Sequence, residues 1–395
     1  MGVCPTHQCA GMNPADPRDP DKLNGLARSI GSLFSDDETT TPPRDDVVWE
    51  EVPENEGRHA YSAGDADPDA LRAAVDAFLR ADVSERDAAA RAVRESAGPL
   101  REAGALDALA DAVERLALES SDSEQEATAA MAQFLLTPGV ASRLVARLGA
   151  SREERRRVDL MKVTRRMGRE MAVAIADALS DTTDRFARRT FLEAMVSMGP
   201  AGMAVVESMV EDSRWFVVRN AVAILGEVGG ERAIELLTSA LAHADSRVRR
   251  EALLALAKVG AGNESAVEDA GLLVYGMIED PDPDVRLAAA MAAGALKVER
   301  ALRPLIKLLD EENDSDVVVG ILRALGQLGD PGAVQAIEKR AGTGFFSRPP
   351  TDVRIAAYRA LHAIGTPHAR SLLEAAREDK DPEVRAAVHQ MLGAR

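Results

Sequence analysis

A short pattern recurs at intervals of 29 to 37 residues through most of this 395-residue chain. It consists of an Asp, two variable residues, a Val-Arg pair, then small or apolar residues, and often a closing Gly. The clearest copies are DSRVRREALLALAKVG (245–260), DPDVRLAAAMAAGALK (282–297) and DPEVRAAVHQMLG (381–393). A repeat of this period means that one supersecondary unit is copied along the chain, and that each copy buries its apolar surface against its neighbours.

Each copy is predicted to be a helix, a tight turn and a second helix. After the Arg position the small and apolar residues recur at helical spacing, and an apolar helical stretch precedes the Asp, as at 233–241, 302–309 and 369–376. Aromatic residues are only 3% of the chain, which argues against an all-β fold. The residues at the Arg position are Thr128, Arg157, Arg188, Val218, Arg249, Arg286, Val318, Arg354 and Arg385.

The turn residues have physical roles in this reading. The Asp precedes each second helix, where its carboxylate can accept hydrogen bonds from free N–H groups. A cation near a helix N-terminus is unfavourable, so the Arg needs an acid, and the neighbouring Asp is expected to supply one. A left-handed residue is expected to end four of the helices, at Gly229, Gly260, Gly329 and Gly365.

These residues resemble the HEAT-repeat family, and in particular bacterial short-repeat arrays of the phycobilisome-lyase-like HEAT type, over about residues 100–395. The resemblance implies an all-α fold, a right-handed α-solenoid of about nine or ten HEAT-like helical hairpins, with the second helices lining the concave face. It also implies a structural ladder along the turns, formed by Asp245, Arg249, Asp282, Arg286, Asp381 and Arg385.

Composition divides the chain near residue 66. Residues 1–66 hold 13 acids and 5 bases with little apolar material, so they are predicted to be a disordered acidic N-terminal tail. Residues 67–395 are predicted to be the solenoid, with a weak N-terminal cap at 67–100 and repeats from 101 to 395. Within the tail, Val48 and Trp49 lie among acids, and this motif either docks into a groove or is a flexible spacer.

One segment is basic in an otherwise acidic protein. Residues 151–170 hold eight bases and four acids, whereas the whole chain has a net charge of −17. On one continuous helix Arg155, Lys162, Arg166 and Arg169 would share a face. The candidate stripe, completed by Arg165, Arg189 and Arg219, either binds an acidic partner, including the chain's own tail in cis, or is a solvated face paired with local acids.

Aromatic residues mark two further candidate contacts. Trp215 opens a predicted second helix and either anchors a partner or packs between repeats. Phe345 and Phe346, with Arg348, lie in an insertion at 342–350 and either protrude as an aromatic finger or fold back over the hairpin.

No catalytic signature is present in the sequence, which lacks HExxH, GxSxG and a phosphate-binding glycine loop. We therefore expect no enzyme activity, cofactor or metal, and a non-catalytic scaffold or adaptor that binds another protein on the concave face. One alternative is a bilin-lyase-like or lyase-accessory protein. A second is an anionic-polymer or DNA binder through the Arg155–Arg219 stripe, although the overall acidity makes nucleic acid an unfavoured partner. No apolar run is long enough to span a membrane, so a cytoplasmic location is expected.

Overall fold

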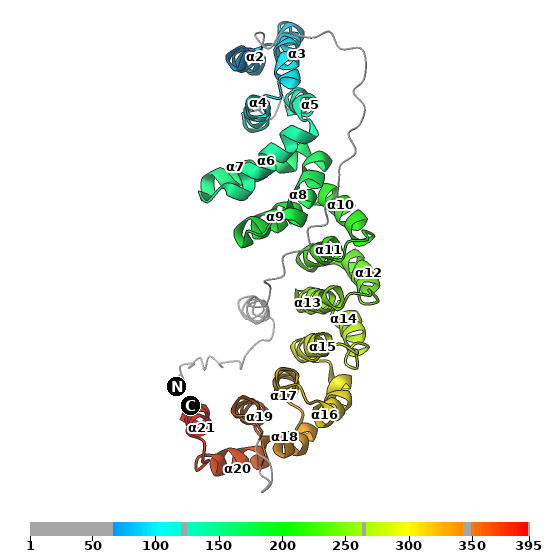
Figure 1. Ribbon diagram of the computed structural model, residues 1–395, viewed down its shortest axis with the longest axis vertical. Coiled ribbons are helices and arrows are strands. Elements are labelled where there is room, and N and C mark those ends of the chain that lie inside the picture. Colours follow the sequence, from blue (N-terminus) through cyan, green and yellow to red (C-terminus); the bar gives the residue numbers. More distant parts are fainter. Residues whose placement is uncertain (1–65, 120–124, 263–265, 343–348, 394–395) are drawn as a thin grey trace, which may run out of the picture. The chain divides into compact units, whose positions relative to one another are not determined.

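The computed structural model describes residues 66–119, 125–262, 266–342 and 349–393 (Figure 1). Every regular element in those ranges is a helix, as the repeat pattern predicts. The described residues up to Ala255 form one compact unit, and those from Leu256 onward form another. The division lies inside one helix, whereas the sequence predicts a single array from residue 67.

The first unit consists of helical hairpins joined by short turns. Its helices are α2 (Pro68–Arg80), α3 (Arg86–Glu102), α4 (Leu106–Leu118), α5 (Gln125–Leu135), α6 (Pro138–Ala150), α7 (Glu154–Met167), α8 (Arg169–Asp181), α9 (Arg185–Ser197), α10 (Pro200–Val210), α11 (Trp215–Val228), α12 (Glu231–Ala240) and the first part of α13 (Ser246–Gly262). The second helices of its later hairpins, α9 and α11, lie on one side, and the first helices α8, α10 and α12 lie on the other (Figure 1).

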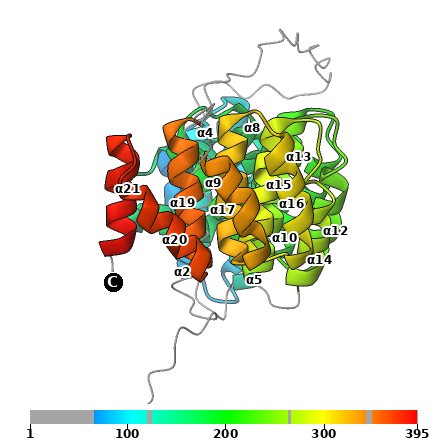
Figure 2. The ribbon, with the colours of Figure 1, turned by 90° about the horizontal axis from the view of Figure 1, so that it is seen from below.

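The second unit has the same two-layer arrangement. After the end of α13 it comprises α14 (Val267–Tyr275), α15 (Pro283–Ala295), η1 (Glu299–Ala301), α16 (Leu302–Glu311), α17 (Ser315–Leu328), η2 (Pro331–Ala333), α18 (Val334–Ala341), α19 (Thr351–Ile364), α20 (Pro367–Ala376) and α21 (Pro382–Gly393). The second helices α15, α17, α19 and α21 pack side by side, and α16, α18 and α20 form the outer layer (Figures 1 and 2).

The Asp of the pattern caps the second helix. Oδ1 of Asp282 accepts hydrogen bonds from the backbone N–H groups of Asp284 and Val285, at 3.0 and 3.4 Å. Asp314 does the same at the start of α17, and Asp245 and Asp381 each accept one such bond. The carboxylate satisfies N–H groups that have no partner within the helix, and so it defines where the helix begins.

The Arg of the pattern bonds differently from the expectation. Arg286 donates to the backbone carbonyls of Asp280 and Pro281, each at 3.0 Å, and its carboxylate partner is Glu312 of the next hairpin, at 2.7 Å. The side chain of Glu312 is only 8% exposed. Its other oxygen accepts the backbone N–H of Asp314, the next capping residue, at 3.0 Å. The Arg therefore ties one turn to the next, and the expectation that its neighbouring Asp is the partner is wrong for Arg286.

The same interlock recurs near the C-terminus. The buried Arg354 pairs with Asp379, which lies two residues before the capping Asp381, just as Glu312 lies two before Asp314. Asp379 also accepts the backbone N–H of Asp381, at 2.8 Å. In each acid-x-Asp sequence, the first acid therefore has one carboxylate oxygen that accepts a backbone N–H of its own turn and one that pairs with the guanidinium of the preceding hairpin.

The copy that contains α17 has Val318 at the position where six of the nine copies have Arg, and a different residue supplies the guanidinium at this turn. Glu312 is two residues before the capping Asp314, as Asp280 is two residues before the capping Asp282, so the backbone carbonyl of Glu312 corresponds to that of Asp280. Arg340 of α18 donates to that carbonyl, and it also donates to the carbonyl of Leu309 at 2.7 Å. A guanidinium therefore reaches this turn from the following hairpin.

Glycine permits a close approach between neighbouring second helices. A Cβ added to Gly326 of α17 would lie 2.9 Å from Cα of Ala360 on α19, and one added to Gly294 of α15 would lie 2.7 Å from Cα of Ala324. The same relation joins Gly226 and Ala255 in the first unit. Because the opposing atom is backbone, a larger residue cannot be accommodated by a rotamer change alone.

The predicted C-terminal glycines are left-handed at two of four places. Gly329 and Gly365 have φ values of +72° and +68° and are left-handed directly after their helices, whereas Gly229 has a φ of +66° but a ψ of −166°, which is not the left-handed conformation. The expectation for Gly260 is wrong, because α13 continues to Gly262. Gly260 instead provides space, since an added Cβ would lie 2.6 Å from Cδ2 of Leu296.

We predict that Gly326→Ala destabilises the protein although Ala is the better helix former. Ala gains about 1 kcal/mol of helix propensity, but overpacking against the Ala360 backbone costs about 1–3 kcal/mol, so a net loss is expected. Gly98→Ala is the control, because nothing lies within 4 Å of its added Cβ. Thermal unfolding measures both variants, and an unchanged or raised melting temperature for Gly326→Ala contradicts the close approach.

We predict that stability falls on acidification from about pH 4.5 downward. The hydrogen bond from the Arg247 guanidinium lowers the pKa of Asp245, and that from the Thr351 hydroxyl lowers the pKa of Asp381. Burial raises the pKa of Glu312, but hydrogen bonds from the Asp314 backbone N–H and from Arg286 outweigh it and leave the pKa lowered.

These carboxylates bind protons more readily in the unfolded chain, so their contribution is complete above the ordinary carboxyl pKa and is lost as pH falls through the lower folded values. Denaturant midpoints between about pH 3 and 7 at constant ionic strength measure the effect. In Glu312→Gln the midpoint should change less steeply with pH than in the wild type. A wild-type midpoint that is independent of pH would contradict the prediction.

Candidate interaction surface

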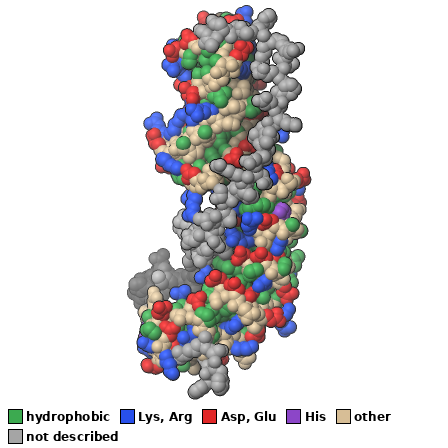
Figure 3. Space-filling model, in the orientation of Figure 1, with side chains coloured by type: hydrophobic (Ala, Val, Ile, Leu, Met, Phe, Trp, Pro, Cys, Tyr) green, Lys and Arg blue, Asp and Glu red, His purple; other side chains and the backbone are tan. Residues whose placement is uncertain are grey.

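The candidate surface is the exposed side of α7, α9 and α11 in the first unit, which we call the basic face. Helix α9 packs against both α7 and α11. Each helix buries its apolar stripe and leaves one or more cationic residues exposed or half-buried. In the space-filling view, blue side chains gather over the region of α7 and α9 (Figure 3). The members are Arg155, Lys162, Arg165 and Arg166 of α7, Arg185 and Arg189 of α9, and Arg219 of α11.

The structure corrects the position of Arg169. Gly168 has φ +64° and ends α7, so Arg169 is the first residue of α8 and does not share a continuous helical face with Arg155, Lys162 and Arg166. The glycine was visible in the sequence, but the regular spacing of the cations across it suggested one helix. Arg169 is exposed at the junction of α7 and α8.

Some of the predicted cations are occupied by contacts within the protein. Lys162 pairs with Asp159 at 3.3 Å, and Arg189 pairs with Glu193 at 2.9 Å. Arg166 donates to the backbone carbonyl of Ala117 at the end of α4. The pairs of Lys162 and Arg189 agree with the alternative interpretation, in which local acids neutralise the stripe.

Four of the cations in this region have no partner within the described part of the chain. Arg155, Arg165, Arg169 and Arg185 are exposed, and none makes a hydrogen bond or ion pair with a described residue. Arg155 and Arg185 occupy the first turns of α7 and α9, where the helix dipole makes a cation unfavourable. The face therefore carries positive charge that contacts among the described residues do not neutralise.

Guanidinium groups stack on the aromatic residues that open α9 and α11. The Arg152 guanidinium lies 3.9 Å from the ring centre of Phe186 and pairs with Asp184 at 2.7 Å. The Arg247 guanidinium lies 3.3 Å from the centre of the Trp215 ring system, and that of Arg219 lies 5.6 Å from it.

We call Phe186, Trp215 and Phe216 the aromatic row. Phe186 and Phe216 both stand two residues after the cap position, and the rings of Trp215 and Phe216 are 5.9 Å apart and nearly perpendicular. All three side chains are half-buried. Sequence reasoning singled out Trp215 but missed Phe186, which could have been found from its equivalent place in the repeat.

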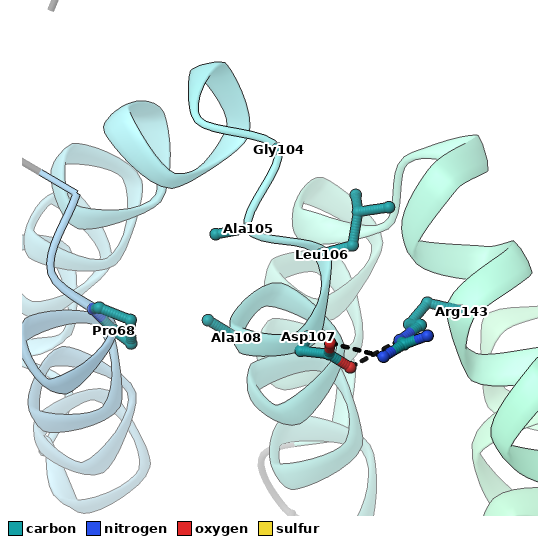
Figure 4. Close-up of a pocket in the computed structure, with 7 residues that line it drawn as sticks. All are labelled: Pro68, Gly104, Ala105, Leu106, Asp107, Ala108 and Arg143. Atoms are coloured by element: carbon teal, nitrogen blue, oxygen red, sulfur yellow. Dashed lines mark hydrogen bonds and ion pairs between the residues drawn. The ribbon is translucent and has the colours of Figure 1, made fainter. Parts of the chain in front are cut away.

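A shallow pocket lies at the other end of the first unit, between the start of α2 and the α3–α4 turn (Figure 4). Its volume is about 460 Å³, and its walls are formed by Pro68, Gly104, Ala105, Leu106, Asp107, Ala108 and Arg143. Both oxygens of Asp107 accept hydrogen bonds from Arg143 at 2.6 Å, and these bonds hold the pKa of Asp107 well below its usual range. The two charged groups of the pocket are therefore committed to each other.

The described ranges contain no group of three or more His, Cys, Asp and Glu side chains arranged to hold a metal ion. No single described helix is long and apolar enough to cross a membrane. The bent pair Glu126–Leu135 and Pro138–Ala150 has the length and composition of a membrane span only when its two helices are taken together. The remaining predicted contacts, Val48, Trp49, Phe345, Phe346 and Arg348, lie outside the described residues.

We predict that Arg152 and Arg155 differ in their contribution to stability. Arg152→Ala should cost about 1 kcal/mol, mostly from the stacking on Phe186, because an exposed ion pair contributes little. Arg155→Ala should change stability by less than about 0.5 kcal/mol, because Arg155 has no partner among the described residues. Chemical denaturation of the two variants tests this, and an equal loss for both would show that Arg155 is engaged in the fold.

Comparison with known proteins places the repeats in a family. Residues 203–269 and 272–345 match a family model described as HEAT repeats. A HEAT repeat-containing taxis protein of Halobacterium salinarum is 32% identical over 141 residues, which are 32% of this chain and 35% of that protein. The chain thus spans about a third of the length of this relative.

Solved structures show the same fold at low identity. The karyopherin Kap121p bound to Pho4p has a TM-score of 0.50 and 12% identity, covering 81% of this chain and 39% of that chain. The same karyopherin bound to the extreme C-terminus of the protein phosphatase Cdc14p gives the same values. The repeat pattern and the helical hairpins agree with the matched repeat model, so residues 203–269 and 272–345 are similar to HEAT repeats, and the described residues have an α-solenoid fold.

Proposed function

We propose that this protein is a non-catalytic scaffold or adaptor, and that its basic face binds an acidic segment of a partner protein that carries an aromatic or aliphatic anchor. The observation that carries the proposal is that Arg155, Arg165 and Arg185 of the basic face have no partner among the described residues, on a surface that also carries the aromatic row at the starts of α9 and α11. Charge complementarity of this kind steers association and selects partners more than it adds affinity.

The aromatic row supplies the second requirement of a binding surface. Rigid, half-buried aromatic side chains with Arg neighbours are the residue types that dominate binding energy in protein interfaces. Trp215 is held by the guanidinium of Arg247, which is itself fixed by Asp245 at 2.7 Å. A preorganised anchor loses little conformational entropy when a partner binds.

The structural relatives are consistent with this class of function. The karyopherin Kap121p is bound to Pho4p in one of these structures and to the extreme C-terminus of the protein phosphatase Cdc14p in another, so a protein of the same fold binds protein partners. At 12% identity this likeness concerns the fold alone, and the choice of the basic face rests on the contacts of this chain.

An anionic polymer is the main competitor for the same cations. Two features favour a protein segment: acids such as Asp159 and Glu193 are interspersed on the face, and the whole chain has a net charge of −17. Both repel a long polyanion but tolerate a short acidic segment. The bilin-lyase alternative gains no support from the contacts of the described residues and continues to rest on the repeat resemblance.

A role in taxis is a second candidate, favoured by the 32% identity to the halobacterial taxis protein over 141 residues. It is compatible with an adaptor that brings signalling proteins together. Deletion of the gene in its source organism, followed by tracking of swimming reversals after a stimulus, tests this role. Unchanged reversal behaviour would contradict it.

The basic face is tested with a fluorescein-labelled synthetic peptide rich in Glu and containing one central Trp. Fluorescence anisotropy should show binding to the full chain, and the double variant Arg155→Glu/Arg185→Glu should bind about tenfold more weakly, or about 1.4 kcal/mol. The matched control is Arg303→Glu/Arg370→Glu, which reverses two exposed charges on α16 and α20 and should not change the affinity.

Two outcomes would contradict the proposal. Equal binding by wild type and the Arg155/Arg185 variant would show that the basic face is not the site. Tighter binding of a labelled DNA duplex than of the acidic peptide, lost in the same variant and steeply dependent on salt, would assign the face to an anionic polymer.

A further inference from the structure

We propose that residues 36–56 of this chain occupy the basic face in cis and compete with the partner for it. This inference rests on the proposed function, because it assumes that the face takes an acidic segment with an apolar anchor. It adds the identity of one such segment and a means of regulating access.

The charge of the tail is concentrated in this segment. Residues 36–56 (DDETTTPPRDDVVWEEVPENE) hold nine acids and one base, whereas the rest of residues 1–66 holds four of each. The entire net charge of −8 in the tail therefore lies within 21 residues. The basic face has three guanidinium groups without a partner among the described residues, at Arg155, Arg165 and Arg185.

The segment also matches the apolar half of the face. Val47, Val48, Trp49 and Val52 stand at its centre between acidic pairs. An aromatic anchor flanked by carboxylates is complementary to an aromatic row flanked by guanidinium groups, because ring edges and aliphatic side chains can pack while the charges pair. Generic acidic stretches without the anchor would satisfy only one of these two features.

The connecting chain is long enough to allow this contact within the first unit. Trp49 lies 19 residues before Pro68, the first residue of α2, and an extended chain spans up to about 3.3–3.6 Å per residue, or about 60 Å here. From the α2–α3 hairpin to the α10–α11 hairpin there are four steps of about 10 Å each, or about 40 Å. A tether of this length gives an effective concentration of about 1 mM.

The size of the effect follows from this tether. If the segment alone binds the face with a Kd of about 0.1 mM, an effective concentration of about 1 mM weakens partner binding by about tenfold. Weak local contacts are therefore sufficient, and the block is released as salt screens the charges.

The experiment compares the full-length wild type with a full-length neutral-tail variant. The variant carries Asn or Gln at all nine acidic positions of the segment, Asp36, Asp37, Glu38, Asp45, Asp46, Glu50, Glu51, Glu54 and Glu56. The probe is the fluorescein-labelled Glu-rich peptide used to test the basic face. It should bind the neutral-tail variant about tenfold more tightly than the wild type, and an added synthetic peptide of residues 36–56 should displace it.

A second measurement detects the contact directly. Carbodiimide joins carboxylates to amines in contact, and Lys162 is an exposed amine on α7. Mass spectrometry should find cross-links between Lys162 and acids of residues 36–56 in the wild type. Their yield should be independent of protein concentration for a contact in cis, and a yield that falls on dilution would assign the segment to a second copy and overturn the proposal.

The outcomes separate this inference from the proposed function. Equal probe binding by wild type and the neutral-tail variant overturns the inference and leaves the basic face as the partner site. Failure of the probe to bind either protein overturns the proposed function and the inference together. Tighter binding by the neutral-tail variant that persists in an Arg155→Glu/Arg185→Glu background also overturns the inference, because the segment would then act elsewhere.

Discussion

The contact between a glycine of one second helix and an alanine of the next sets how closely three pairs of neighbouring second helices pack in this protein. At Gly326 and Ala360, as at Gly294 and Ala324, the two helix backbones approach so closely that no Cβ fits between them. This proximity brings each turn within reach of the next, so that a guanidinium on one hairpin can reach a carboxylate on its neighbour. The stacking also aligns the exposed positions of successive helices, which is how single cations on separate repeats become a face.

Arginine serves two opposite purposes in this chain, and its surroundings determine which. Arg286 and Arg354 have carboxylate partners with very low exposure and link successive turns, as expected for charged groups that must be paired when removed from water. Arg155 and Arg185 lie in the first turns of α7 and α9 and have no such partner among the described residues. The fold thus satisfies its charges inside the turns and leaves an excess at the surface of the first unit.

Much of the fold follows from the repeat pattern, because the pattern consists of local signals. Capping by Asp282 and Asp314 and the left-handed Gly329 and Gly365 depend only on nearby residues, so the spacing predicted them. The carboxylate partner of Arg286 could not be found in this way, since it lies in another hairpin, although the repeated acid-x-Asp sequence was available as a signal. The expectation for Gly260 was wrong for a similar reason. This glycine leaves space for the side chain of Leu296, a contact that local sequence signals do not predict. Of the candidate site, the cations were found from composition, whereas Phe186 and the break at Gly168 required the positions of helix ends.

The substitution of Val318 for the usual Arg has a consequence for anyone who would idealise this protein. The Glu312 carbonyl still receives a guanidinium, but from Arg340 of the following hairpin. Averaging the repeats into a consensus would place Arg at position 318 and direct two cations toward one acceptor. The copies share a hydrogen bond from a guanidinium to the carbonyl at this turn, but not the residue that donates it. A sequence alignment that treats each position independently would therefore misjudge positions 318 and 340.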